Sequence, residues 1–155
     1  MSYNAWLTVH ILGVVLFLGN IVVTAVWKML ADRTREPAVV AYAQRLVSIT
    51  DVVFTATGAT LIFTSGHVLA REFGGVFDGP LWITLGWSLF VASGVIWVVA
   101  LIPIEVMQER MARAFRHEAT IPERYWTLSR LWAGIGAVAT VLPLLNLYVM
   151  VFKPD

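Results

Sequence analysis

Two histidines and one methionine are the residues of this sequence whose types suit the binding of a haem group. His10 lies in a long apolar run, Trp6–Lys28, whose interior carries no charge. An ionisable side chain inside a membrane span usually faces the protein interior and marks a functional site. Haem iron takes axial histidine or methionine ligands, and a porphyrin fits between facing helices of a bundle. We therefore predict His10 as an axial ligand of haem b, with His67 or Met150 as the opposite ligand.

The same three residues also have structural interpretations. A histidine in a packed bundle can simply hydrogen-bond a neighbouring carbonyl, and this applies to His10. His67 is expected close to the membrane interface, where a histidine can extend its ring towards solvent. Met150 could fill space between apolar helices. The spacing of these residues matches no metal-binding motif such as HExxH, so residue types alone do not choose between the two interpretations.

A second group of candidates consists of charged residues at the ends of the predicted spans. Lys28, Asp51, Glu105 and Arg130 should all lie at one membrane depth. Buried charges are stable when paired, so we expect Lys28 or Arg130 to pair with Asp51. One interpretation is a ring of ion pairs that fixes the topology. The other is a site in which Lys28 and Arg130 bind an anionic group, such as a haem propionate, a phospholipid head group or a carboxylated substrate.

The first two spans carry polar residues on distinct faces. With the periodicity of an α-helix, one side of the first span holds His10, Gly13, Val14, Phe17, Asn20, Ile21, Thr24 and Lys28. Asn20 and Thr24 would then form a polar track for protons or a substrate. The second span has two competing faces, one with Asp51, Thr55, Gly58, Ile62 and Ser65, and the other with Thr57, Thr60, Thr64 and His67. The sequence does not choose which of them packs inward.

Four apolar segments must position these residues. The chain is 59% hydrophobic and 14% charged, whereas about a quarter of the residues in soluble domains are charged. Spans are predicted at about 6–28, 47–70, 81–104 and 131–152, each long enough to cross a hydrocarbon core of roughly 30 Å. They leave no room for a soluble domain, so we expect residues 1–155 to form a single integral membrane domain. The predicted fold is all-α, an up-and-down four-helix transmembrane bundle whose second and third helices extend into the cytoplasm.

Basic residues predict the orientation of this bundle. Nine of the eleven Lys and Arg residues lie in the two connections on one side, and only Arg71 and Lys153 lie on the other. By the positive-inside rule, both termini and the loop 71–80 should be outside and the two basic connections cytoplasmic. We expect a multi-pass protein of a bacterial inner membrane. No basic segment precedes the first run and no small-residue cleavage site follows it, so we expect a span rather than a signal peptide.

Composition also limits the chemistry and the partners. The chain has no cysteine, which excludes disulfides, thiolate metal sites and cysteine nucleophiles. Its net charge of +1 and the scatter of its basic residues give no stripe for binding nucleic acid. The expected partner is the lipid bilayer, with a homo-oligomer or a membrane redox partner as further candidates. The serines show no recognisable catalytic triad, so hydrolysis is not expected.

Several runs of the sequence resemble known proteins. HILGVVLFLGN, AVWKMLADRT, TDVVFTATGA, SGVIWVVALIPIE and MVFKP together resemble a bacterial family of four-span predicted integral membrane proteins of unknown function. More distantly, His10 followed by Gly13 and Gly19 resembles the haem-containing bacterial membrane protoporphyrinogen oxidase and related four-helix membrane cytochromes. The second resemblance implies haem on His10. The second glycine and the basic residues after it are shifted from the oxidase pattern, so haem binding is implied more than that reaction.

Our first hypothesis is therefore an integral membrane haem b protein that transfers electrons or oxidises a membrane-soluble substrate. Whether it is an enzyme, namely a haem-dependent membrane oxidoreductase, stays open. The alternative is a non-catalytic membrane accessory subunit or scaffold, in which the polar residues only hold helices together. A small transporter or proton path is a third hypothesis, against which the four spans show no inverted repeat.

Overall fold

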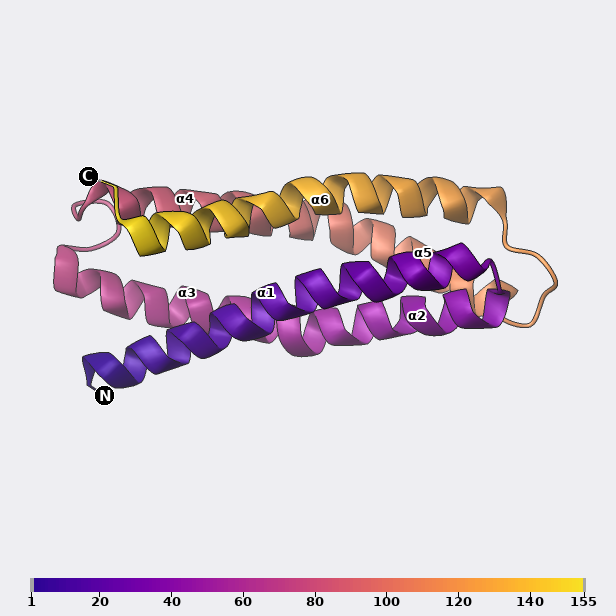
Figure 1. Cartoon of the computed structure of the whole chain (residues 1–155), viewed down its shortest axis with the longest axis horizontal. Coiled ribbons are helices and arrows are strands. Elements are labelled where there is room, and N and C mark those ends of the chain that lie inside the picture. The colour runs from indigo at the N-terminus through magenta and orange to yellow at the C-terminus, as the bar shows by residue number, and fades with distance from the viewer. Residues whose placement is uncertain (1, 155) are drawn as a thin grey trace.

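Four long helices lie along the long axis of the molecule, and consecutive helices run in opposite directions (Figure 1). The computed structural model describes residues 2–154, and that range contains no β-strand. The elements are α1 (Tyr3–Thr34), α2 (Pro37–Thr50), η1 (Asp51–Ala56), α3 (Thr57–Ala70), η2 (Arg71–Phe73), α4 (Leu81–Ile96), η3 (Trp97–Leu101), α5 (Ile102–Phe115) and α6 (Glu123–Phe152). All four continuous helices are long and apolar enough to cross a membrane. The predicted all-α bundle of four membrane helices is confirmed.

The bundle has two chemically different ends. The N-terminus, the C-terminus and the loop between α3 and α4 lie together at one end, which we call the terminal end (Figure 1). The turn from α1 to α2 and the connection from α5 to α6 lie at the other end, which carries most of the basic residues and which we call the basic end. The second and third helices continue past their apolar segments towards the basic end, as α2 and α5, so their predicted extension is confirmed.

The helices associate in two pairs. In the first pair α1 packs along α2 and α3, and in the second pair α4 and α5 pack along α6. The pairs meet mainly at the basic end, where α2 contacts α5, whereas α1 and α6 touch only sparsely. Because the pairs are held apart along part of their length, space can remain between them.

Two glycines bring α1 and α3 into direct backbone contact. A Cβ atom added at Gly58 would lie 2.8 Å from the carbonyl oxygen of Gly13 and 2.8 Å from the backbone nitrogen of Phe17. Small residues allow this close approach between membrane helices. The contact decides which face of the second span packs inward. Thr55, Gly58 and Ser65 are buried against α1, and the rival face with Thr57, Thr60 and Thr64 is exposed.

The second and third long helices each contain a π-helical segment. η1 lies between α2 and α3, and η3 lies between α4 and α5. η3 ends at Leu101, two residues before Pro103. Proline has no N–H and clashes with the carbonyl four residues earlier, and a wider turn relieves both conflicts. η1 contains neither proline nor glycine, so local sequence does not account for it.

Pro143 lies inside α6 and is buried. Because proline lacks an N–H, the carbonyl of Ala139 loses its donor within the helix. The Ser93 hydroxyl of α4 donates to that carbonyl oxygen at 3.1 Å. Within a bilayer, a side chain of a neighbouring helix must supply such a bond since no water can. This bond attaches α4 to α6 at the middle of the second pair.

The glycine contact between α1 and α3 generates a stability prediction. Gly58→Ala should lower the free energy of unfolding by about 1–3 kcal/mol, because the new methyl group overlaps backbone atoms. Gly19→Ala is the matched control on α1, since a Cβ at Gly19 would meet nothing within 4 Å. Thermal unfolding of both variants in detergent checks this. Equal melting temperatures for the two would contradict the contact.

Candidate functional site

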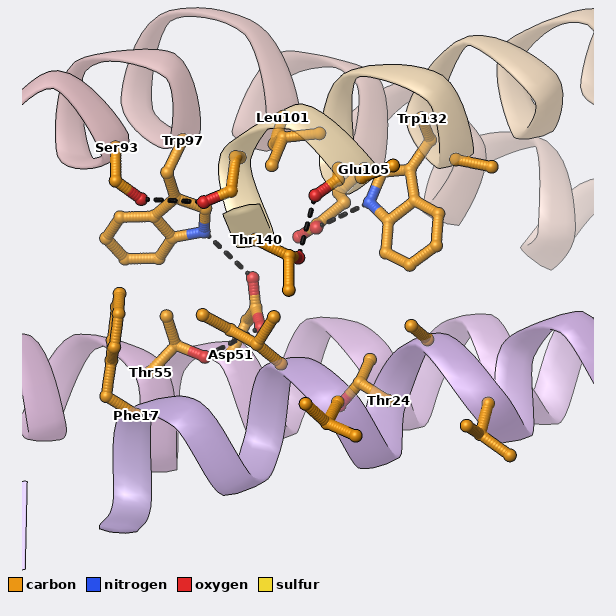
Figure 2. A pocket seen from close by; sticks show the side chains of 18 of the residues that line it. Phe17, Thr24, Asp51, Thr55, Ser93, Trp97, Leu101, Glu105, Trp132 and Thr140 are labelled. Atoms are coloured by element: carbon orange, nitrogen blue, oxygen red, sulfur yellow. Dashed lines mark hydrogen bonds between the residues drawn. The ribbon is translucent and has the colours of Figure 1, made fainter. Parts of the chain in front are cut away.

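A cavity of about 450 Å³ lies between the two helix pairs, in the apolar middle of the bundle (Figure 2). Most of its wall is apolar, with Phe17, Ile21 and Leu101 among the lining residues. Its polar side chains are Thr24, Asp51, Thr55, Ser93, Trp97, Glu105, Trp132 and Thr140. Both π-helical segments contribute to the wall, so the two irregular stretches of the middle helices meet at the same place.

Asp51 is the most heavily hydrogen-bonded group of the cavity. Its Oδ2 accepts from the indole Nε1 of Trp97 at 2.9 Å, and its Oδ1 accepts from Thr55 Oγ1 at 3.0 Å and Asn20 Nδ2 at 3.2 Å (Figure 2). Asn20 is oriented in turn by Thr24, whose hydroxyl donates to Asn20 Oδ1 at 3.1 Å. Asp51 therefore joins three of the four membrane helices. The predicted polar track on α1 ends on this carboxylate.

Glu105 is the second carboxyl group of the cavity. It is 6% exposed and accepts from the indole Nε1 of Trp132 at 2.9 Å. Glu105 lines the same cavity as Asp51, and the charges of the two carboxyl groups act on each other. Within residues 2–154, neither carboxyl group has an ion-pair partner. Two carboxyl groups so close together can hold one proton between them or bind a cationic group.

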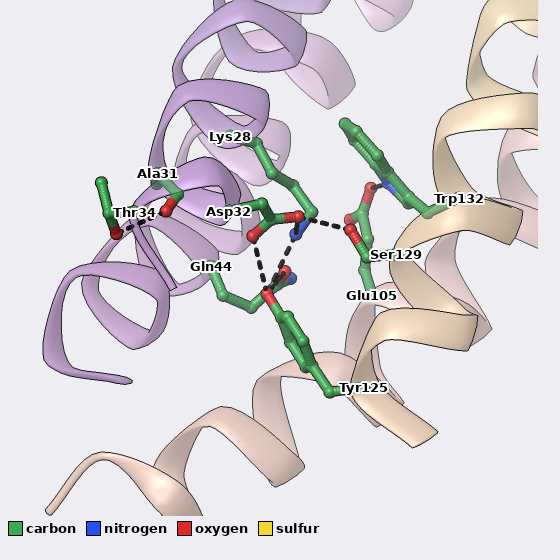
Figure 3. Close-up of polar contacts among 9 residues, drawn as sticks. All are labelled: Lys28, Ala31, Asp32, Thr34, Gln44, Glu105, Tyr125, Ser129 and Trp132. Carbon is green, nitrogen blue, oxygen red and sulfur yellow. Dashed lines mark hydrogen bonds and ion pairs between the residues drawn. The ribbon is translucent and has the colours of Figure 1, made fainter. Parts of the chain in front are cut away.

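A polar cluster lies next to the cavity on the side of the basic end (Figure 3). Lys28 is only 1% exposed, and its Nζ donates to the hydroxyl of Tyr125 at 3.0 Å and to Asp32 Oδ2 at 3.3 Å. The hydroxyl of Ser129 also donates to Asp32. Tyr125 Oη lies 3.4 Å from Gln44 Oε1, which brings α2 into the cluster. The Lys28 ammonium group is thus paired with Asp32 inside this cluster, and Lys28 does not line the cavity.

The expected pairing of Lys28 or Arg130 with Asp51 is wrong. Lys28 pairs with Asp32, which lies one helical turn further along α1. Arg130 is exposed and bonds to Thr127 of its own helix at 3.4 Å. Asp51 receives neutral donors instead of a cation. Of the predicted charged residues, Asp51 and Glu105 line the cavity, Lys28 lies beside it and Arg130 lies apart. Asn20 of the predicted polar track contacts Asp51.

The predicted haem ligand His10 packs against α3. The Ser65 hydroxyl donates to the carbonyl of Leu61, so the His10 Nδ1–H is the donor in the 3.0 Å contact between Nδ1 and Ser65 Oγ. A Cβ atom at Gly66 would lie 3.3 Å from Cε1 of the ring, which shows how closely the imidazole approaches this helix. The ring is thus turned towards a protein neighbour, as expected for a histidine within a membrane span.

The two candidate opposite ligands have other neighbours. His67 lies with its Nδ1 3.0 Å from the carbonyl oxygen of Phe63, and its ring packs against Trp87 with centroids 4.6 Å apart. Met150 covers Gly86 of α4. None of the three predicted ligands lines the cavity. Among residues 2–154, no group of three or more His, Asp or Glu side chains could hold a metal ion. Haem binding stays a prediction.

Asp32, Trp97, Tyr125 and Trp132 are among the residues of the site that sequence reasoning missed. Two signals could have found some of them. A tryptophan deep within an apolar span, such as Trp97, needs an acceptor for its indole N–H and so points to a buried oxygen. Asp32 follows Lys28 at the spacing of a helical ion pair. Tyr125 gives no such signal, because its partners come from distant parts of the chain.

Comparison with known proteins bears on the whole chain. A family model described as "Predicted integral membrane protein (DUF2269)" matches residues 5–154, a range that includes all of the cavity residues. No curated protein and no solved structure matches the chain. The resemblance to four-span integral membrane proteins is confirmed, whereas the resemblance to haem proteins receives no support from these comparisons.

Proposed function

The chain belongs to this family of integral membrane proteins, and from that premise we propose that it binds a membrane-soluble small molecule in the cavity between its helix pairs. The cavity itself is the observation that carries the proposal. Its volume of about 450 Å³ falls within the range of roughly 300 to 1,000 Å³ that is usual for small-molecule sites. Like such sites, it combines apolar walls with a few convergent polar groups.

The position of the cavity supports access from the bilayer. Exposed residues of α1, including Val22 and Val26, line one side of it, and exposed residues of α6, including Ala133 and Ala137, line the other. The cavity thus opens between α1 and α6, which touch only sparsely. The α6 side of this opening consists of small residues, with Gly136 between the two alanines. An apolar ligand would pass from the lipid into the cavity without crossing water.

The polar wall supports a ligand with a cationic head group. Asp51 and Glu105 face the cavity and form no ion pair within residues 2–154, because the nearby Lys28 is paired with Asp32. A buried carboxylate is stabilised by a cation, and an ammonium group can serve two carboxylates at once. π-Helical turns such as those that carry Asp51 and Trp97 are frequent at functional sites. We expect an amphipathic amine to be bound in preference to the matching alcohol or carboxylic acid.

Blocking the cavity should abolish binding. A Cβ at Gly136 would meet nothing within 4 Å, so Gly136→Leu fills the opening without a backbone clash. Quenching of tryptophan fluorescence by a long-chain alkylamine with a brominated tail reports binding, since Trp97 and Trp132 line the cavity. We expect the affinity to fall by about tenfold or more, or about 1.4 kcal/mol.

Gly134→Leu is the matched control for this measurement. Gly134 also faces open space on α6 but does not line the cavity, so this variant should bind like the wild type. Equal affinities for Gly136→Leu and Gly134→Leu would remove the binding proposal and favour a non-catalytic scaffold. Asp51→Asn and Glu105→Gln should weaken the alkylamine while leaving the matching alcohol unaffected.

Haem b binding at His10, with electron transfer as its purpose, is the second candidate. The observation in its favour is the contact of His10 Nδ1 with Ser65, because ligating histidines are usually oriented by a partner at their other ring nitrogen. Bound haem would supply one-electron chemistry. His67 and Met150 contact other neighbours, so the opposite ligand is not accounted for.

A visible spectrum tests this second candidate. Protein purified from haem-supplemented cells should show a Soret band that His10→Ala loses and that His67→Ala and Met150→Leu retain. Wild-type protein without such a band, or His10→Ala with a full one, would exclude haem on His10.

We further propose that the basic end faces the cytoplasm of a bacterial inner membrane, as the positive-inside rule predicts. The chain contains no cysteine, so single cysteines can report sidedness without background. In intact spheroplasts, an impermeant maleimide should label Ser2→Cys, whereas Glu118→Cys should react only after permeabilisation. The opposite labelling pattern would invert the topology.

A further inference from the structure

Buried amide and carboxyl atoms without partners gather at the basic end of the bundle. Gln108 of α5 is 0% exposed, and neither of its side-chain polar atoms has a hydrogen-bond partner within residues 2–154. In the same range the Nε2 of Gln44 on α2 and the Oε2 of Glu109 on α5 are also buried and unpaired. Polar groups in such positions are normally satisfied by internal water. The packing of α2 against α5 brings these groups into one region.

The polar groups of α5 form a row that reaches the outside of the bundle. Glu105, Gln108 and Glu109 are three and four residues apart, so they share one helix face, and all three are buried. Glu109 Oε1 accepts from Arg113 Nε at 3.0 Å, and the Arg113 side chain is 77% exposed. The row therefore begins at solvent and ends on the Glu105 carboxyl group in the cavity wall.

A second line of polar groups leads to the same carboxyl group. Gln44 contacts the Tyr125 hydroxyl, which lies 3.0 Å from Lys28 Nζ (Figure 3). Lys28 is close enough to Glu105 to interact with its charge. Hydroxyl, amide and carboxyl groups joined by water can exchange protons along their hydrogen bonds. Polar groups from all four helices thus surround the region between the basic end and the cavity.

On the terminal side of Thr55 and Ser93 the polar lining of the cavity gives way to aromatic packing. The rings of Phe17 and Phe90 lie there with centroids 6.3 Å apart, and Phe17 is buried. One turn further along α1, Gly13 is in backbone contact with Gly58. At this level the helices contact each other through apolar side chains and backbone, which offer no group that could relay a proton.

We propose that a water-filled path carries protons between the basic end and the Asp51–Glu105 pair, and that it is closed towards the terminal end. A proton from solvent binds a Glu109 carboxylate oxygen, passes through water held by Gln108 and is transferred to a Glu105 carboxylate oxygen; release follows the reverse order. Of the charged groups, Lys28 of α1 acts on Glu105 of the pair, and Lys28 in turn contacts Asp32 of α1 and Tyr125 of α6. The purpose of this path rests on the proposed binding site. Proton transfer along it would set the charge of the Asp51–Glu105 pair that a bound ligand contacts.

Hydrogen–deuterium exchange of the carboxyl groups tests the path without any ligand. Infrared spectra of the protein in lipid nanodiscs should contain a protonated-carboxyl band that Asp51→Asn or Glu105→Gln removes. On transfer to D₂O the wild-type band should shift within the mixing time. Gln108→Met keeps the side-chain length but removes the amide, and should slow this shift by about tenfold or more.

Three comparisons identify the cause of a slower shift. Val106→Met changes the exposed face of the same helix and should exchange like the wild type. Gln108→Glu keeps a proton-carrying group and should also remain fast. If Gln108→Met does not fold, Gln44→Met replaces it and should likewise slow the shift.

The path is overturned if folded Gln108→Met and Gln44→Met both exchange as fast as the wild type, in which case the water has a structural role only. It is equally overturned if no protonated-carboxyl band depends on Asp51 or Glu105. Gly136→Leu should exchange normally, because it closes the opening towards lipid and leaves α5 unchanged. Failure of the path would therefore leave alkylamine binding intact, and failure of alkylamine binding would leave the exchange result intact.

Discussion

The hydrogen bond between the Trp97 indole and the Asp51 carboxylate holds the two helix pairs together in the middle of the membrane. The two atoms are 2.9 Å apart and belong to π-helical segments of different pairs. Within a bilayer a carboxylate has no water to bind, so its donors must come from neighbouring helices. Asn20, Thr55 and Trp97 supply them from three helices. The need to satisfy this one group constrains the rotation of these three helices about their axes.

The cavity is a consequence of how differently the two pairs are built. Gly13 and Gly58 let α1 and α3 meet backbone to backbone. In the second pair, Pro103 follows a widened turn, and Pro143 leaves a carbonyl that Ser93 has to satisfy. Each pair thus has a distorted helix, with η1 in the first and η3 in the second, and the space that remains between the pairs contains Asp51 and Glu105. Lys28 stays outside this space because Asp32 and Tyr125 bind it.

Much of the fold could be predicted from the sequence, because hydropathy and helical periodicity are local properties. The four spans and the inward face of α1 with Asn20 and Lys28 are confirmed. The site could be predicted only in part. Which carboxylate Lys28 binds depends on the rotation of each helix, and η1, which reorients Asp51, has no sequence signal. Trp97 and Tyr125 join the site through partners far away in the chain.

The most direct test of the account is to locate an amphipathic amine in crystals of the protein. Anomalous scattering from an alkylamine with a brominated tail gives the position of the tail without assumptions about the ligand. We expect a bromine peak between α1 and α6 beside Gly136, with the nitrogen directed at Asp51 and Glu105. Bromine peaks found only on the outer, lipid-facing surfaces of the helices would contradict the assignment of this cavity as a binding site.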